Sequence, residues 1–393
     1  MSITTPAGFR AAGVAAGLKA SGGPDVALVV NDGPDQVAAA VLTTNRVQAA
    51  PVLWTRQVVG DGVVSAVVLN SGGANACTGP EGFADTHRSA EHAAQSLGIS
   101  AADVVVCSTG LIGERLNMPA LLGGIDAAAG ALSGDGGTDA AHAVMTTDTV
   151  AKEAVVHRRS GEATWSVGGM AKGAGMLAPA LATMLSVLTT DAAVDPADAD
   201  AALRAATRVT FDRVDSDGCM STNDTVVLLA SGASGAAVSR EELTDAVTAV
   251  CGDLARQLVA DAEGASHDIA VTVSGATGED AALAVARAVT RSNLVKAAIF
   301  GNDPNWGRIL AAAGTVPEDV APFDPHAVDV TVNGVTVCRN GAGEGREVVA
   351  LVDLAASREV RIDVDLHAGD AAATVWTNDL THDYVHENSA YSS

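Results

Sequence analysis

Short apolar runs that end in loops of small residues are the first feature of the hydrophobic pattern. Residues 65–69 (SAVVL) run into NSGGANACTG at 70–79, and residues 103–107 (DVVVC) run into STGLIG at 108–113. Continuous apolar runs of this length predict strands that are buried on both faces. Because the loops consist of small residues, we expect their backbone amides to approach a ligand closely.

Helical patterns alternate with these strands. Residues 239–242 (SREE) form a capping box, which predicts the start of a helix. The apolar stripe of that helix consists of Leu243, Val247, Val250, Leu254 and Leu258. A second helix is expected to begin in residues 195–200 (DPADAD).

The last third of the chain is predicted to be rich in β-strands. Residues 328–338 (VDVTVNGVTVC) predict a hairpin, because Asn333-Gly334 suits a type I′ turn. Residues 361–366 and 373–376 predict a further strand pair, and residues 316–325 are the most linker-like stretch. The mixed order of strands and helices predicts an α/β fold of layered sandwiches, classed as α/β or α+β.

Composition and charge exclude several classes of partner. The 393 residues carry 23 Lys+Arg and 47 Asp+Glu, a net charge of −24, and 48% of them are hydrophobic. So acidic a chain is a poor ligand for nucleic acid or an anionic membrane. No run approaches 18 apolar residues, and the five cysteines are odd in number and form no C-x-x-C pair. We therefore expect a cytoplasmic protein without a disulfide framework.

A glycine-rich segment at 172–191 (KGAGMLAPALATMLSVLTTD) holds a candidate nucleophile, Thr183. From the residues alone, the more common interpretation is a turn that feeds a buried strand or helix. A threonine becomes a nucleophile when a base activates it, and the α-amine of an N-terminal threonine can be that base. Such a threonine requires cleavage of the preceding peptide bond, and the small Ala182 beside it suits that step.

This segment also resembles the self-cleavage site of the ornithine acetyltransferases, the bifunctional glutamate N-acetyltransferases of arginine biosynthesis. Other blocks resemble the same family, in family order over essentially the whole chain. They are AVLTTNRVQAAPV at 40–52, the loops at 70–79 and 108–113, MTTDT at 145–149, STNDT at 221–225, DAEGA at 261–265, GNDPNWGR at 301–308 and DLTHDYVHENSAYSS at 379–393. Departures from the family pattern are Ala7, Gly73, Cys219-Met220 and the terminal Ser393.

The resemblance implies a catalytic apparatus. Thr183 would be the nucleophile, and the Ala182–Thr183 bond would be cut autocatalytically into fragments 1–182 and 183–393. The second fragment would include a C-terminal hairpin subdomain from about residue 325. Thr109, by its hydroxyl, and Gly110, by its backbone N–H, would form the oxyanion hole. On loop statistics alone, STG would be read as a plain turn.

The resemblance also implies a set of substrate-binding residues: Thr146, Lys172, Thr183, Glu263, Asn388 and Ser393. Lys172 is one of only four lysines, and a cation beside the nucleophile could hold a substrate carboxylate. Glu263 follows a helix end, where a carboxylate is unfavourable for the helix dipole. Asn388 and Ser393 lie in a polar tail that would normally fray.

The implied function is transfer of an acetyl group from N-acetylornithine to glutamate by a ping-pong mechanism. The family fold is a two-domain sandwich shared with self-cleaving aminopeptidases. Its members assemble as heterotetramers of two alpha and two beta fragments. No cofactor is implied, although the sequence leaves open whether acetyl-CoA is also a donor. The histidines, including His382 and His386, form no metal-binding pattern.

Two other interpretations remain open on the sequence. A self-cleaving aminopeptidase or amidohydrolase would use the same nucleophile and transfer the acyl group to water. A non-catalytic amino-acid-binding protein would retain the fold and leave the chain uncut.

Overall fold

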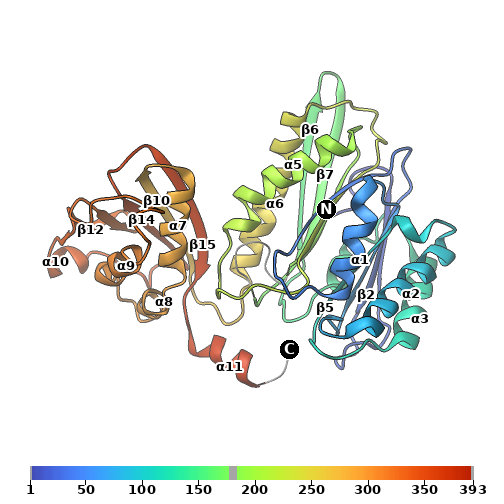
Figure 1. The fold of residues 1–393 in the computed structure, drawn as a ribbon, viewed down its shortest axis with the longest axis horizontal. Helices are drawn as coiled ribbons and strands as arrows, with labels where there is room; N and C mark the ends of the chain where they lie inside the picture. Colours follow the sequence, from blue (N-terminus) through green and yellow to red (C-terminus); the bar gives the residue numbers. More distant parts are fainter. Residues whose placement is uncertain (1, 177–183, 391–393) are drawn as a thin grey trace. The chain divides into compact units, whose positions relative to one another are not determined.

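The computed structural model describes residues 2–176 and 184–390, in which the chain divides into two compact units (Figure 1). Unit 1 holds Met1–Asp212 and Cys219–Asp261, and unit 2 holds Arg213–Gly218 and Ala262–Tyr391. These units do not coincide with the two fragments expected from cleavage, which stay a prediction. The hairpin expected to open a subdomain near residue 325 lies inside unit 2.

Unit 1 contains two sheets. The four-stranded sheet has the order β1-β2-β4-β5, with β1 (Phe9–Val14), β2 (Val26–Asn31), β4 (Ala66–Ser71) and β5 (Val104–Thr109). The five-stranded sheet has the order β3-β9-β8-β7-β6, with β3 (Val37–Leu42), β6 (Lys152–Ser160), β7 (Ala163–Lys172), β8 (Leu185–Thr190) and β9 (Thr225–Ala230). The predicted strands at 65–69 and 103–107 are therefore confirmed, and they are parallel neighbours.

Helices cover the outer face of each sheet (Figure 1). Those on the four-stranded sheet are α1 (Ala50–Val58), α2 (Gly79–Leu97), α3 (Met118–Ala131) and α4 (Gly137–Ala143). Those on the five-stranded sheet are α5 (Pro196–Val209) and α6 (Arg240–Ala260). Short 3-10 turns are η1 (Val59–Asp61), η2 (Ala101–Asp103) and η3 (Phe211–Arg213). Unit 1 is thus a helix–sheet–sheet–helix sandwich, which confirms the layered α/β prediction.

Small side chains allow these layers to pack closely. In β9, Val227 and Leu229 belong to the core shared with the four-stranded sheet. The opposite face of the same sheet lies against α6, where a Cβ added to Gly169 would come within 2.7 Å of Val250 Cγ1. Strand β9 is therefore buried on both faces, which explains its continuous apolar run.

The helix starts follow their sequence signals. Ser239 caps α6 through a complete capping box with Glu242, and the predicted stripe of five apolar residues is buried. Asp195 caps α5 by accepting a hydrogen bond from the Asp198 N–H at 2.8 Å. Both predictions are confirmed, because cap chemistry depends only on neighbouring residues.

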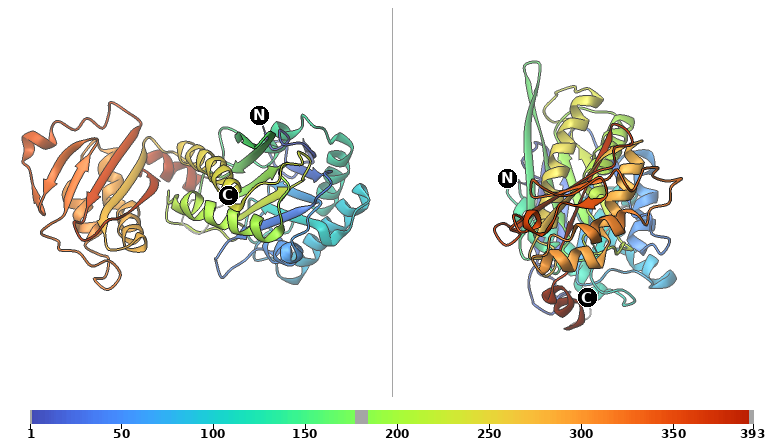
Figure 2. Two further views of the ribbon diagram at one scale, coloured as in Figure 1. Left: turned by 90° about the horizontal axis from the view of Figure 1, so that it is seen from above. Right: turned by 90° about the vertical axis from the view of Figure 1, so that its left-hand side faces the viewer.

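Unit 2 is a six-stranded sheet covered on one face by helices (Figure 2). Its order is β13-β12-β11-β14-β10-β15, with β10 (Asp268–Ala276), β11 (Asp329–Val332), β12 (Val335–Arg339), β13 (Ala342–Gly343), β14 (Glu359–Asp365) and β15 (Ala371–Asn378). Its helices are α7 (Glu279–Thr290), α8 (Asn293–Phe300), α9 (Trp306–Ala313), α10 (Arg346–Val349) and α11 (His382–Ala390).

One of the two strand-pair predictions in unit 2 is confirmed and the other is wrong. The β11–β12 hairpin turns at Asn333 and Gly334, which have φ of 48° and 83°. Strands β14 and β15 do not pair with each other, because β10 lies between them, parallel to β14 and antiparallel to β15. A hairpin is determined by its own turn residues, so it can be predicted locally. Strand β10 lies about 90 residues before β14 in the chain, so its position between β14 and β15 cannot be predicted from the residues around them.

Candidate active site

The candidate oxyanion loop lies where β4 and β5 end together. The two strands are parallel, and their last residues, Ser71 and Thr109, are in register. The loop after β4 returns to β5, because the Gly73 N–H donates to the Thr109 carbonyl at 3.0 Å. Gly110 has a φ of 127°, and a Cβ there would lie 2.5 Å from Gly73 N, so only glycine fits. The structure thus brings the two predicted small-residue loops into contact.

Lys172 ends β7 and reaches Thr109 inside unit 1. Both side chains are buried, and Lys172 Nζ donates to Thr109 Oγ1 at 3.2 Å. An ammonium has donors only, so the Thr109 oxygen must be the acceptor in this hydrogen bond. The hydroxyl proton of Thr109 therefore remains to be donated elsewhere. This is the arrangement that an oxyanion donor needs.

A buried carboxylate, Asp148, organises the surroundings of Lys172. Its oxygens accept hydrogen bonds from Lys152 Nζ at 2.7 Å, from Gly173 N at 2.7 Å and from Thr146 N at 3.0 Å. Although burial acts to raise its pKa, the charges of Lys172 and Lys152 lower the pKa of Asp148 to about 2. The predicted residue Thr146 is therefore held beside the Lys172 strand end by a carboxylate that is ionised at neutral pH.

Lys152 is fully buried between two carboxylates. Its Nζ lies 2.7 Å from Asp148 Oδ1 and 2.6 Å from Asp261 Oδ2. Breaking one partner of such a buried ion pair strongly destabilises a protein, because it leaves an uncompensated charge. Sequence reasoning missed these residues, although Asp148 and Asp261 stand in the quoted MTTDT and DAEGA blocks.

The STNDT block joins the loops to the strand that follows the candidate nucleophile. Asn223 Nδ2 donates to the carbonyls of Ala74 at 2.7 Å and Ser108 at 2.8 Å, so it ties both loops together. Asp224 accepts the Met184 N–H at 3.0 Å, and its other oxygen is buried without a hydrogen-bond partner among the described residues. Burial raises the pKa of Asp224 well above its usual value.

Three predicted site residues lie outside the described residues: Ala182, Thr183 and Ser393. Their assignments as cleavage site, nucleophile and substrate-binding residue stay predictions. Covalent connectivity places Thr183 directly before Met184, whose N–H and carbonyl are held by Asp224 and Thr225 N.

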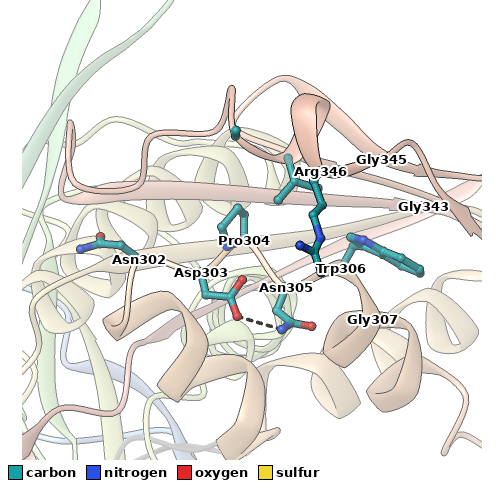
Figure 3. A pocket seen from close by; sticks show the side chains of 11 residues that line it. Asn302, Asp303, Pro304, Asn305, Trp306, Gly307, Gly343, Gly345 and Arg346 are labelled. Carbon is teal, nitrogen blue, oxygen red and sulfur yellow. Dashed lines mark hydrogen bonds between the residues drawn. The ribbon is translucent and has the colours of Figure 1, made fainter.

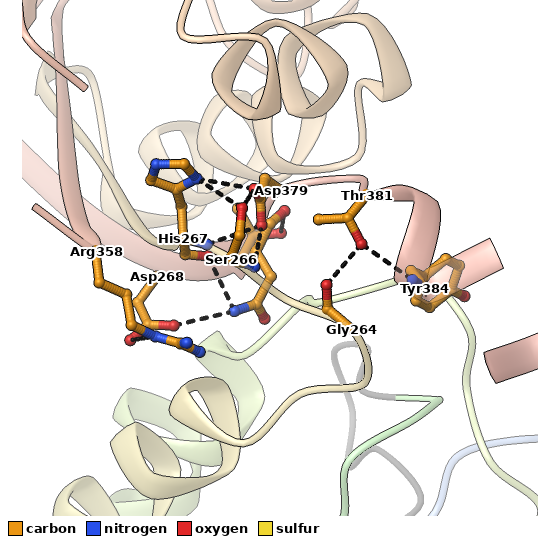
Figure 4. A network of polar contacts seen from close by, with 10 residues as sticks. Gly264, Ser266, His267, Asp268, Arg358, Asp379, Thr381 and Tyr384 are labelled. Carbon is orange, nitrogen blue, oxygen red and sulfur yellow. Dashed lines mark hydrogen bonds and ion pairs between the residues drawn. The ribbon is translucent and has the colours of Figure 1, made fainter. Parts of the chain in front are cut away.

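The other two predicted substrate residues meet in unit 2. Asn388, on α11, donates to Glu263 Oε2 at 2.9 Å. The segment around them is held by a polar network (Figure 4). The Asp379 carboxylate accepts the N–H groups of Ser266 and His267, each at 2.9 Å, and Thr381 Oγ1 donates to the Gly264 carbonyl at 2.6 Å. The tail expected to fray is therefore a helix over residues 382–390, anchored to the loop that carries Glu263.

The GNDPNWGR block lines a surface cavity of about 680 Å³ in unit 2 (Figure 3). Arg346 extends over it toward Asn305 and Trp306, and Asn305 Nδ2 donates to Asp303 Oδ2 at 2.8 Å. None of the predicted site residues that the structure describes lines this cavity. The block was quoted from the sequence for family resemblance only, and it belongs to unit 2, whereas Thr109 and Lys172 belong to unit 1.

Two further properties concern the described residues alone. Within residues 2–176 and 184–390, no group of three or more His, Cys, Asp and Glu side chains could hold a metal ion. In the same part of the chain, no helix has the length and apolar content needed to cross a membrane. None of the five cysteines, all of which lie in these ranges, forms a disulfide.

Comparison with known proteins gives consistent matches. A model described as the ArgJ family matches residues 10–393. The arginine biosynthesis bifunctional protein ArgJ of Streptomyces coelicolor is 62% identical over 394 residues, covering 100% of both chains. The protein of the same name from Mycobacterium leprae is 56% identical over 398 residues, covering 100% of this chain and 96% of its own. A solved ornithine acetyltransferase of Mycobacterium tuberculosis, complexed with ornithine, is 59% identical at a TM-score of 0.44, covering 45% of this chain and 94% of that one.

The layered α/β fold and the match to the arginine biosynthesis bifunctional proteins over the whole chain define an enzyme of the acyltransferase class. More particularly, the chain belongs to the ArgJ family. The resemblance drawn from the sequence blocks is thereby confirmed.

Proposed function

We propose that this enzyme is a glutamate N-acetyltransferase of arginine biosynthesis, which takes the acetyl group from N-acetylornithine and passes it to glutamate. The observation that carries the proposal is the hydrogen bond from the buried Lys172 ammonium to Thr109 Oγ1. It leaves the Thr109 hydroxyl proton available to another acceptor beside Gly110, at the end of two parallel strands. Acyl transfer needs such fixed donors, because its tetrahedral intermediate carries a negative oxygen.

The proposed first half-reaction acylates the chain. Thr183 Oγ attacks the acetyl carbonyl of N-acetylornithine, and its proton passes to its own α-amine. The oxygen of the tetrahedral intermediate is stabilised by the Thr109 hydroxyl and the Gly110 N–H. The C–N bond then breaks, the leaving nitrogen takes the proton, and ornithine departs.

The second half-reaction reverses these steps with a new amine. The amine of glutamate attacks the acetyl ester, Thr183 leaves as the alcohol, and N-acetylglutamate is formed. The same oxyanion donors serve both half-reactions. Every group used belongs to the chain or its substrates, so the proposed reaction needs no cofactor.

The α-amine that acts as base exists only after cleavage of the Ala182–Thr183 bond. We infer that Thr183 Oγ attacks the Ala182 carbonyl and that the resulting ester is hydrolysed into fragments 1–182 and 183–393. The hydrogen bond from the Met184 N–H to Asp224 supports this inference, because this bond fixes the residue that follows Thr183. The proposal extends to an assembly of two fragments of each kind in the cytoplasm, and to acetyl-CoA as a second donor.

A mass measurement tests the covalent intermediate. Purified protein incubated with N-acetylornithine alone is expected to gain one acetyl group at the N-terminus of the 183–393 fragment. Glutamate added afterwards should remove that group and yield N-acetylglutamate. Intersecting initial-rate lines without an acetylated fragment would contradict the ping-pong mechanism.

The same samples separate the alternative functions. An aminopeptidase or amidohydrolase would release acetate in place of N-acetylglutamate, and a non-catalytic binding protein would remain a single uncut chain on a denaturing gel. Acetyl-CoA is tested as donor by replacing N-acetylornithine with it in the same assay.

A further inference from the structure

A buried carboxylate in unit 1 builds the loop that carries Lys19. Asp25 is fully buried, and its side chain accepts the N–H groups of Ala16 and Leu18, each at 2.6 Å, and of Lys19 at 3.0 Å. The Asp25 carbonyl accepts the Ser71 N–H at 2.9 Å. Ser71 is in register with Thr109, so Asp25 connects the Lys19 loop to the end of β4, beside the oxyanion loop.

The same loop packs directly on the glycines next to Thr109. A Cβ added to Gly72 would lie 2.9 Å from the Leu18 carbonyl oxygen, and the φ of Gly72 is 106°. The following residue, Gly73, donates its N–H to the Thr109 carbonyl. Leu18 is therefore separated from Thr109 by a single layer of glycine backbone, and Lys19 is the next residue along the chain.

The Lys19 ammonium is held in place and only partly used. Its Nζ donates to the Pro24 carbonyl at 2.7 Å, which occupies one of its three donors. In the described part of unit 1, no carboxylate lies within ion-pair distance of it. Burial lowers the pKa of Lys19, the charges of Asp25 and Asp148 oppose that shift, and the charge of Lys172 adds to it. The side chain is thus a half-buried cation within the electrostatic field of the Thr109–Lys172 site.

We propose that Lys19 binds the α-carboxylate of the amino-acid substrates, an inference that rests on the proposed acetyl transfer. The α-carboxylate is shared by N-acetylornithine and glutamate, so one fixed cation serves both half-reactions. Lys172 is less suited to this task, because its ammonium already donates to Thr109 and faces the charge of Asp148. Lys19 retains free donors beside the same loop.

The test replaces Lys19 by Met, which keeps the backbone N–H that Asp25 holds. With Lys19→Met, we expect KM to rise about 10- to 100-fold for both N-acetylornithine and glutamate, with kcat little changed, because a charge-assisted hydrogen bond present in ground and transition states is lost. Lys19→Arg keeps a positive charge, so its KM values should be close to those of the wild type. Arg88→Met, which removes an exposed cation from α2, is the charge-matched control and should leave both KM values unchanged.

A substrate without the charge identifies the group that is bound. The wild type should use the α-methyl ester of N-acetylornithine about 10- to 100-fold less efficiently than the acid, and Lys19→Met should treat the two alike. Unchanged KM values, or an unchanged preference for the acid in Lys19→Met, would overturn the assignment; if that variant does not fold, Lys19→Gln is measured in the same way. A wild type that forms no N-acetylglutamate at all would instead overturn the proposed function.

Discussion

The hydrogen bond between Lys172 and Thr109 makes their contributions to catalysis interdependent. Thr109→Ala removes one oxyanion donor, which typically lowers kcat about 100- to 1000-fold. Lys172→Met replaces lysine by an uncharged side chain of similar length, and so removes the ammonium that orients the Thr109 hydroxyl. A hydrogen bond to a charged group contributes about 1.5–3 kcal/mol, which corresponds to a loss of about 10- to 150-fold in kcat.

The double variant distinguishes a shared role from two separate ones. When Thr109 is already alanine, the Lys172 ammonium has no hydroxyl to orient. We therefore expect Thr109→Ala/Lys172→Met to have a kcat close to that of Thr109→Ala alone, with a coupling energy of about 1.5–3 kcal/mol. Thr109→Ser keeps a hydroxyl and is the matched control, which should retain most of the wild-type kcat.

The assay is the initial rate of N-acetylglutamate formation at saturating N-acetylornithine and glutamate, normalised to the cleaved fraction of each variant. If the two single losses multiply in the double variant, the hydroxyl-orientation argument is refuted. If Lys172→Met raises KM and leaves kcat unchanged, Lys172 acts on substrate binding alone, as the family resemblance implies.

Three other changes have defined outcomes. Thr183→Ala should remain one chain on a denaturing gel and form no N-acetylglutamate; two fragments would place the cut elsewhere. Because its pKa is lowered to about 2, Asp148 contributes about 2 kcal/mol to the free energy of unfolding. This contribution is present above about pH 4 and is lost as the pH falls toward 2. The difference in the free energy of unfolding between wild type and Asp148→Asn, measured in urea, should therefore decrease by about 2 kcal/mol as the pH falls from about 4 to 2. The raised pKa of Asp224 makes wild-type stability fall as the pH rises above about 4. Asp224→Asn keeps an oxygen for the Met184 N–H and carries no charge, so in urea unfolding its stability relative to the wild type should increase as the pH rises above about 4.

Features with a local cause were predictable from the sequence. The capping box at Ser239, the Asn333-Gly334 turn and the two apolar runs that became β4 and β5 all depend on residues adjacent in the chain. The family blocks added Thr109 and Lys172, which the structure joins by a hydrogen bond across 63 positions. They also supplied Glu263 and Asn388 as separate substrate-binding candidates, and the structure joins these two by a hydrogen bond that anchors the C-terminal helix.

Features that depend on distant partners required the folded chain. An apolar run indicates that a strand is buried and leaves its neighbour undetermined, so β10 between β14 and β15 was not foreseen. The role of Asp148 emerged in the same way, because a carboxylate keeps its charge in a protein interior only when cations from other elements surround it. Lys152 is only four residues from Asp148, whereas Lys172 ends the following strand, so the pairing of β6 with β7 brings the second charge to Asp148. Local periodicity therefore determines which residues turn inward, and long-range packing determines which of them meet.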